Sequence, residues 1–95
     1  MLRRAVHCDD ESSDAHNRLG VLLLASGRVA EGHAHLHRAH GLAPTDSGVL
    51  LHLAQACALL GRLDEAVVHV TSAERCGADP ALAEAVRREI FAKPA

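Results

Sequence analysis

The chain contains one pattern twice, as SDAHNRLGVLLLASGRVAEGHAHLHRA at residues 13–39 and as SGVLLHLAQACALLGRLDEAVVHVTSA at residues 47–73. The pattern therefore recurs with a period of about 34 residues. Seven positions are identical between the two copies, namely Ser13 and Ser47, Leu19 and Leu53, Gly27 and Gly61, Arg28 and Arg62, Glu31 and Glu65, His35 and His69, and Ala39 and Ala73. Composition alone would give roughly two or three such matches, so the sequence indicates a genuine repeat.

Each copy predicts two amphipathic helices joined by a tight turn. The first helix is expected to begin at a cap formed by Ser12 or Ser13 and to end at a left-handed Gly27. Its expected buried stripe comprises Ala15, Leu19, Leu22 and Leu23. The return helix is expected to stop at Gly41, just ahead of Pro44.

The second copy predicts the same arrangement and a further helix after it. Its two helices are expected to end at Gly61 and Gly77. The pair Asp79-Pro80 then reads as a helix cap followed by proline at the first helical position, which predicts a fifth helix.

The small residues of both copies resemble those of the tetratricopeptide repeat family. The matching positions are Leu19-Gly20 and Leu53-Ala54 in the first helices, Gly32, Ala66, Ala39 and Ala73 in the second helices, and Pro44 in the loop. The resemblance implies an all-α fold, a right-handed helical-repeat superhelix (α-solenoid) of about five helices.

The resemblance covers residues 1–95 as a single domain. Its expected parts are the end of a preceding repeat (1–12), two repeats (13–46 and 47–80) and a C-terminal capping helix (80–93). The chain would then begin inside a repeat, which favours a fragment of a longer array. Exposed repeat ends of this kind predict self-association.

Composition argues against several other classes of function. Ten Lys and Arg against twelve Asp and Glu give a net charge of −2, with no basic stripe for nucleic acid. The longest apolar run, 21–25, is too short to cross a membrane. Three cysteines without a CxxC pair favour a reducing, cytoplasmic setting. No phosphate-binding loop or catalytic motif occurs, so we expect no cofactor and no enzyme activity.

The family resemblance also implies a binding surface for a protein or peptide on the concave face. Carried over by position, that face would present Asp14, Asn17, Val21, Leu24, Leu51, Gln55, Ala58 and Leu59. The amides suit a ligand backbone and the leucines its apolar side chains. The other interpretation of Leu24 and Leu59 is that they only complete the core.

Two further hypotheses stay open on the sequence. The chain could be a segment of a multidomain enzyme such as a transferase, since repeats of this type are often fused to such enzymes. It could also be a histidine-rich metal-binding protein, because His33, His37 and His40 recur about one helical turn apart. No carboxylate or thiolate is obviously placed to complete that set, and Cys57 is expected to be a core residue.

Overall fold

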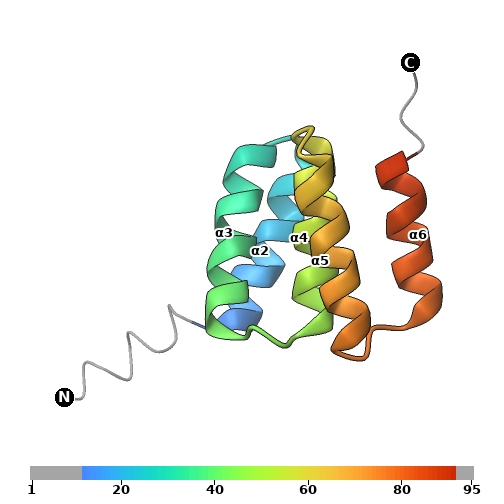
Figure 1. The fold of residues 1–95 in the computed structure, drawn as a ribbon. Coiled ribbons are helices and arrows are strands. Elements are labelled where there is room, and N and C mark those ends of the chain that lie inside the picture. The colour runs from blue at the N-terminus through green and yellow to red at the C-terminus, as the bar shows by residue number, and fades with distance from the viewer. Residues whose placement is uncertain (1–11, 92–95) are drawn as a thin grey trace.

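A computed structural model describes residues 12–91, which form five helices and no strand (Figure 1). These are α2 (Ser13–Ala25), α3 (Val29–Leu42), α4 (Ser47–Leu59), α5 (Leu63–Arg75) and α6 (Pro80–Phe91). In Figure 1, α2 and α4 stand behind α3 and α5, and α6 closes the row at the right. The expected all-α helical repeat is confirmed, and α4 begins and ends one repeat period after α2. The partial repeat expected before residue 12 and the last residues of the expected capping helix lie outside the described range.

The turns at the ends of α2, α4 and α5 share one backbone conformation. Their φ values are +85°, +82° and +95°, at Gly27, Gly61 and Gly77 respectively. In the first of them the N–H of Arg28 donates to the carbonyl of Leu23 at 2.8 Å, closing a Schellman-type turn. Three of the four helix ends predicted at a glycine, those at Gly27, Gly61 and Gly77, are therefore confirmed.

Side-chain caps begin three of the helices. Ser12, rather than Ser13, accepts the N–H of Ala15 at 3.3 Å. Asp79 accepts the N–H of Ala81 at 2.8 Å, ahead of Pro80. The Asp46 carboxylate accepts the N–H of Gly48 at 3.0 Å, a cap that the sequence analysis did not identify. Each cap satisfies a backbone donor that the helix itself leaves unpaired.

The prediction that α3 stops at Gly41 is wrong. The helix continues through Gly41 to Leu42, and Ala43 leaves the helical conformation with φ −138° and ψ 75°. Ala43 precedes Pro44, whose ring disfavours the helical region for the residue before it. Proline therefore ends this helix, and Gly41 is an ordinary helical residue.

The core is concentrated in the second half of the chain. Its main cluster joins α4, α5 and α6 through Leu50, Leu51, Ala54, Cys57, Ala66, Val70, Ala73, Ala83, Val86 and Ile90. A smaller cluster of Leu36, Leu53 and Ala56 joins α3 to α4. Phe91, the one aromatic residue, is exposed.

The buried stripe predicted for α2 is also wrong. Gly20 is the buried residue of this helix, whereas Leu19 and Leu22 are 41% and 63% exposed and Ala15 is exposed. The reason is geometric, because α2 turns Gly20 toward α3. Leu19 and Leu22 consequently face sides that α3 does not cover.

Helices α2 and α3 nest at two glycines. A Cβ on Gly32 would lie 2.9 Å from the carbonyl oxygen of Gly20 and 2.9 Å from Cδ2 of Leu24. A Cβ on Gly20 would lie 2.6 Å from Cγ of Leu36. Side chains at these positions would have to push the helices apart, so close backbone packing here depends on glycine.

The substitution of glycine by alanine should have opposite effects at two positions of α3. Gly32→Ala should lower the free energy of unfolding by about 1–3 kcal/mol, because the new methyl group overpacks the α2–α3 contact. Gly41→Ala meets nothing within 4 Å and should stabilise by about 0.5–1 kcal/mol through helix propensity. Urea denaturation followed by circular dichroism measures both. Equal shifts for the two variants would contradict the close approach of α2 and α3.

Candidate functional site

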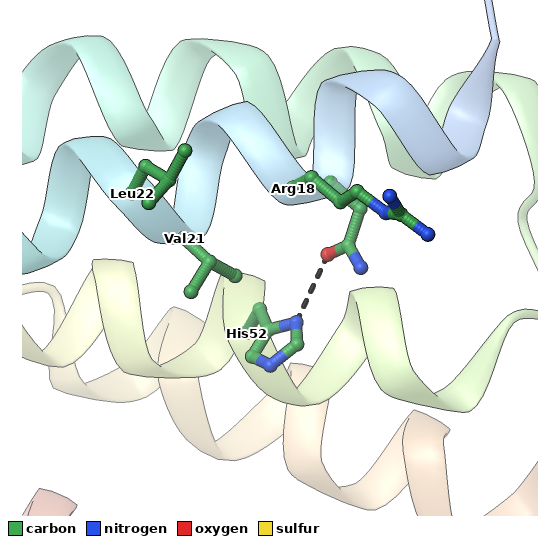
Figure 2. A pocket seen from close by; sticks show the side chains of 5 residues that line it. Arg18, Val21, Leu22 and His52 are labelled. Atoms are coloured by element: carbon green, nitrogen blue, oxygen red, sulfur yellow. Dashed lines mark hydrogen bonds between the residues drawn. The ribbon is translucent and has the colours of Figure 1, made fainter.

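A hollow of about 390 Å³ lies between α2 and α4 (Figure 2). Its lining comprises Asn17, Arg18, Val21 and Leu22 from α2 and His52 from α4. Figure 2 shows Val21 and His52 facing each other across the gap between the two helices. The hollow thus combines apolar walls with an amide, a guanidinium and an imidazole.

A hydrogen bond between helices organises the polar part of this hollow. Nδ1 of His52 lies 2.9 Å from Oδ1 of Asn17, and it is the ring N–H that donates to the amide oxygen (Figure 2). Burial lowers the pKa of His52, with the nearby charge of Asp46 opposing the shift. The imidazole is therefore neutral at physiological pH, and its Nε2 is an acceptor.

A second hollow, of about 220 Å³, lies between α4 and α6. It is lined by Gly48, Leu51, His52, Gln55, Leu82, Ala85 and Val86. The amide of Gln55 donates to the carboxylate of Glu89 at 3.3 Å, which links α4 to α6 beside the hollow. Because His52 lines both hollows, they adjoin, and we refer to the lining residues of both together as the groove.

The residues predicted for the binding face fall into two groups. Asn17, Val21, Leu51 and Gln55 line the groove. The other four are not lining residues: Asp14 pairs with Arg18 at 3.2 Å, Leu24 and Ala58 pack against the core clusters, and Leu59 is exposed. Their role in binding stays a prediction.

The sequence analysis missed the contribution of α6. Leu82, Ala85 and Val86 follow Gly48, Leu51 and His52 by one repeat period each, so α6 extends the same helix register. Continuing the offset past residue 80 would have found them. Asp79-Pro80 marks a new helix start, but the helix after it lacks the residues that identify the repeat.

The three histidines of the predicted metal set belong to two pairs of neighbouring rings. The rings of His33 and His37 are 6.2 Å apart, and the ring of His40 lies against that of His69 at 6.1 Å. Nδ1 of His40 is buried without a hydrogen-bond partner. A metal site of His33, His37 and His40 stays a prediction.

Cys57 is fully buried and lies against a carboxylate. Its Sγ is 3.8 Å from Oε1 of Glu65, which accepts from the thiol. Burial, together with the charge of Glu65, raises the pKa of Cys57 to about 11. The thiol is therefore protonated at neutral pH, which does not suit a nucleophile.

The fold is that of a helical-repeat protein, and the groove lies along α2, α4 and α6. A sequence model described as tetratricopeptide repeat matches residues 23–90. The chain belongs to the tetratricopeptide repeat family, whose domains serve as protein-interaction modules. Comparison with curated proteins and with solved structures gave no match.

None of the helices between residues 12 and 91 combines the length and the apolar character needed to cross a bilayer.

The lowered pKa of His52 predicts a loss of stability in mild acid. A histidine whose folded pKa lies below its unfolded value stabilises the fold above about pH 6.5, and that stability is lost as the pH falls toward the folded pKa. His52→Gln should therefore lose less stability than the wild type between about pH 7.5 and about pH 5.5. Urea midpoints at the two pH values measure this.

Comparing His52→Gln with the wild type controls for the other groups that titrate in this pH range. His33 and His69, whose pKa values are also lowered by burial, change both proteins alike. Glutamine retains a donor for Asn17. An identical pH dependence in the two proteins would contradict the burial of a neutral imidazole at this position.

Proposed function

We propose that the chain binds a segment of a partner protein along the groove formed by α2, α4 and α6. The observation that carries this proposal is the pair of adjoining hollows, which share His52 and follow the first helices of the stack. Two connected hollows suit successive side chains of one peptide segment.

Polar groups along the groove support recognition of a peptide backbone. Asn17 keeps its amide N–H donors while its oxygen accepts from Nδ1 of His52, and Gln55 adds a second amide further along α4. A peptide backbone carries one donor and one acceptor at nearly every residue, so amides and a neutral imidazole complement it without requiring a charged ligand.

Apolar residues on both sides of the groove support burial of ligand side chains. Leu22 on α2 is 63% exposed and Leu82 on α6 is 57% exposed, and each lines one of the two hollows. Covering a leucine side chain contributes about 1.5–3 kcal/mol when burial is complete. Exposed leucines at the two sides of a polar centre favour a segment with apolar residues flanking its contact with His52.

The setting and assembly state belong to the same proposal. Free thiols at Cys57 and Cys76 favour a reducing, cytoplasmic compartment. The exposure of Leu19 on α2 supports self-association through an end of the stack.

Substitutions in the groove should weaken peptide binding. A ligand would be selected from a displayed random-peptide library against the wild-type chain, and dissociation constants measured by fluorescence anisotropy. Leu82→Glu should weaken binding at least about tenfold, because a carboxylate would replace an apolar contact. The double variant Asn17→Ala, Gln55→Ala should also bind more weakly, because it removes both amides.

Val68→Glu is the matched control. Val68 is 60% exposed, which is similar to the 57% exposed fraction of Leu82. It lies on α5, however, and does not line the groove. It should bind the selected peptide as the wild type does. Equal affinities for Leu82→Glu, the double variant and Val68→Glu would show that the peptide binds elsewhere.

Self-association has a separate measurement. Light scattering at increasing concentration should show a mass above 10.0 kDa that Leu19→Glu lowers, since this change places a charge on the exposed side of α2. A wild-type chain that stays monomeric at every concentration would contradict the proposed self-association.

A further inference from the structure

Three metal-ligating side chains converge where the two repeats meet. His33 comes from α3, Cys57 from α4 and Glu65 from α5. Their ligand atoms all lie within 4.8 Å of one another. In the described region no other group of three or more His, Cys, Asp or Glu side chains meets this condition. We propose that His33, Cys57 and Glu65 bind a Zn²⁺ ion that joins the first repeat to the second.

The spacing of the three side chains fits a tetrahedral ion. With Zn–S near 2.3 Å and Zn–N or Zn–O near 2.0 Å, neighbouring ligands of a tetrahedral site lie about 3.5 Å apart. The Cys57 Sγ and Glu65 Oε1 are already 3.8 Å apart. Cys57 is held in the core, whereas Glu65 is exposed and His33 half-buried. Rotation of these two side chains closes the remaining distance without moving a helix.

The chemistry of the ligands favours a transition-metal ion such as Zn²⁺ over Mg²⁺ and Ca²⁺. Thiolate and imidazole are ligands of Zn²⁺, and Mg²⁺ and Ca²⁺ prefer oxygen alone. As the Sγ–Zn bond forms, the thiol proton of Cys57 leaves to solvent. Thiolate and carboxylate together then carry two negative charges, which the ion neutralises. A neutral complex is the form that a partly buried position tolerates best.

Comparison of the two repeats shows that the cluster is not a property of the repeat itself. Cys57 and Glu65 correspond, one repeat period earlier, to Leu23 and Glu31. Glu31 forms an ion pair with Arg28, with Nε and Oε1 2.7 Å apart. The repeat therefore supplies a carboxylate twice, but a thiol replaces leucine in the second copy alone, and there the carboxylate lies beside it.

Side chains that can supply a fourth metal ligand lie near the three proposed ligands. His37 lies one turn beyond His33, with the two rings 6.2 Å apart. His69 lies one turn beyond Glu65 and is close enough to it for the carboxylate charge to act on its pKa. A water molecule or one of these imidazoles completes a coordination that three protein ligands leave open.

Cobalt substitution distinguishes this site from the binding of metal by scattered histidines. The experiment uses the full chain in a non-thiol reductant, with Cys8→Ser and Cys76→Ser so that Cys57 is the remaining thiol. Co²⁺ should bind once per chain and give a thiolate-to-cobalt charge-transfer band in the near ultraviolet. Zn²⁺ should abolish the band stoichiometrically and raise the thermal midpoint by several degrees.

Variants at the three ligands complete the test. In the same background Cys57→Leu, which introduces the residue of the first repeat, should lose the band. His33→Gln and Glu65→Gln should each weaken Co²⁺ binding at least about tenfold. Glu65→Gln changes an exposed side chain, so it keeps the test valid even where Cys57→Leu fails to fold. His35→Gln, which alters a histidine stacked on His16 in the first repeat, should bind Co²⁺ as the parent does.

Two results would overturn the proposal. The first is the absence of a thiolate band at excess Co²⁺, which would mean that imidazoles alone hold the metal. The second is unchanged affinity in either His33→Gln or Glu65→Gln, which would remove that residue from the site.

Discussion

Three of the four turns between the described helices have a glycine in a left-handed conformation that other residues adopt only with strain, and the fourth, between α3 and α4, is set by Pro44. The turns at Gly27, Gly61 and Gly77 have nearly the same φ, so the chain leaves α2, α4 and α5 through the same type of turn. The repeat in the sequence therefore corresponds to a repeated arrangement of helices. First helices come to lie beside first helices, and the groove is the surface that they share.

The repeats differ in how tightly and how fully they are packed. The first pair closes on glycines, with room for no side chain between Gly20 and Gly32, and α2 buries little else. The second pair has Ala54 and Ala66 at the same positions, both fully buried, and supplies most of the main core. Helix α4 contacts α2, α3, α5 and α6, so it is the central element of the described stack.

Much of this fold follows from local signals in the sequence. The period, the glycine turns and the Asp79-Pro80 helix start each depend on a few adjacent residues, which is why they could be predicted. The end of α3 was missed because Gly41 and Pro44 both signal a helix end, and only the proline acts here. The burial of α2 could not be predicted from periodicity, since Leu19 and Gly20 lie on neighbouring faces and the neighbour decides which one is covered.

Part of each candidate site could likewise be predicted from the sequence, and part depends on how the helices pack. Asn17, Val21, Leu51 and Gln55 were predicted because the resemblance to the tetratricopeptide repeat family places these positions of the first helices on the concave face. Their hydrogen bonds, to His52 for Asn17 and to Glu89 for Gln55, depend on distances between helices that no spacing reveals. Cys57 and Glu65 lie four residues on either side of Gly61, so a hairpin at that glycine brings them together. The approach of His33 depends on how α3 packs on α4.

The groove and the cluster of His33, Cys57 and Glu65 are connected through α4. His52 and Cys57 are five residues apart, which places them about 140° apart around the helix, so one faces α2 and the other faces α3 and α5. Helix α2 is in turn fixed to α3 by the close contact at Gly20 and Gly32. An ion that fastened α3 to α4 would therefore also fix the distance between α2 and α4. Because the Asn17–His52 hydrogen bond spans that distance, such an ion would preorganise the polar centre of the groove and lower the entropic cost of binding there.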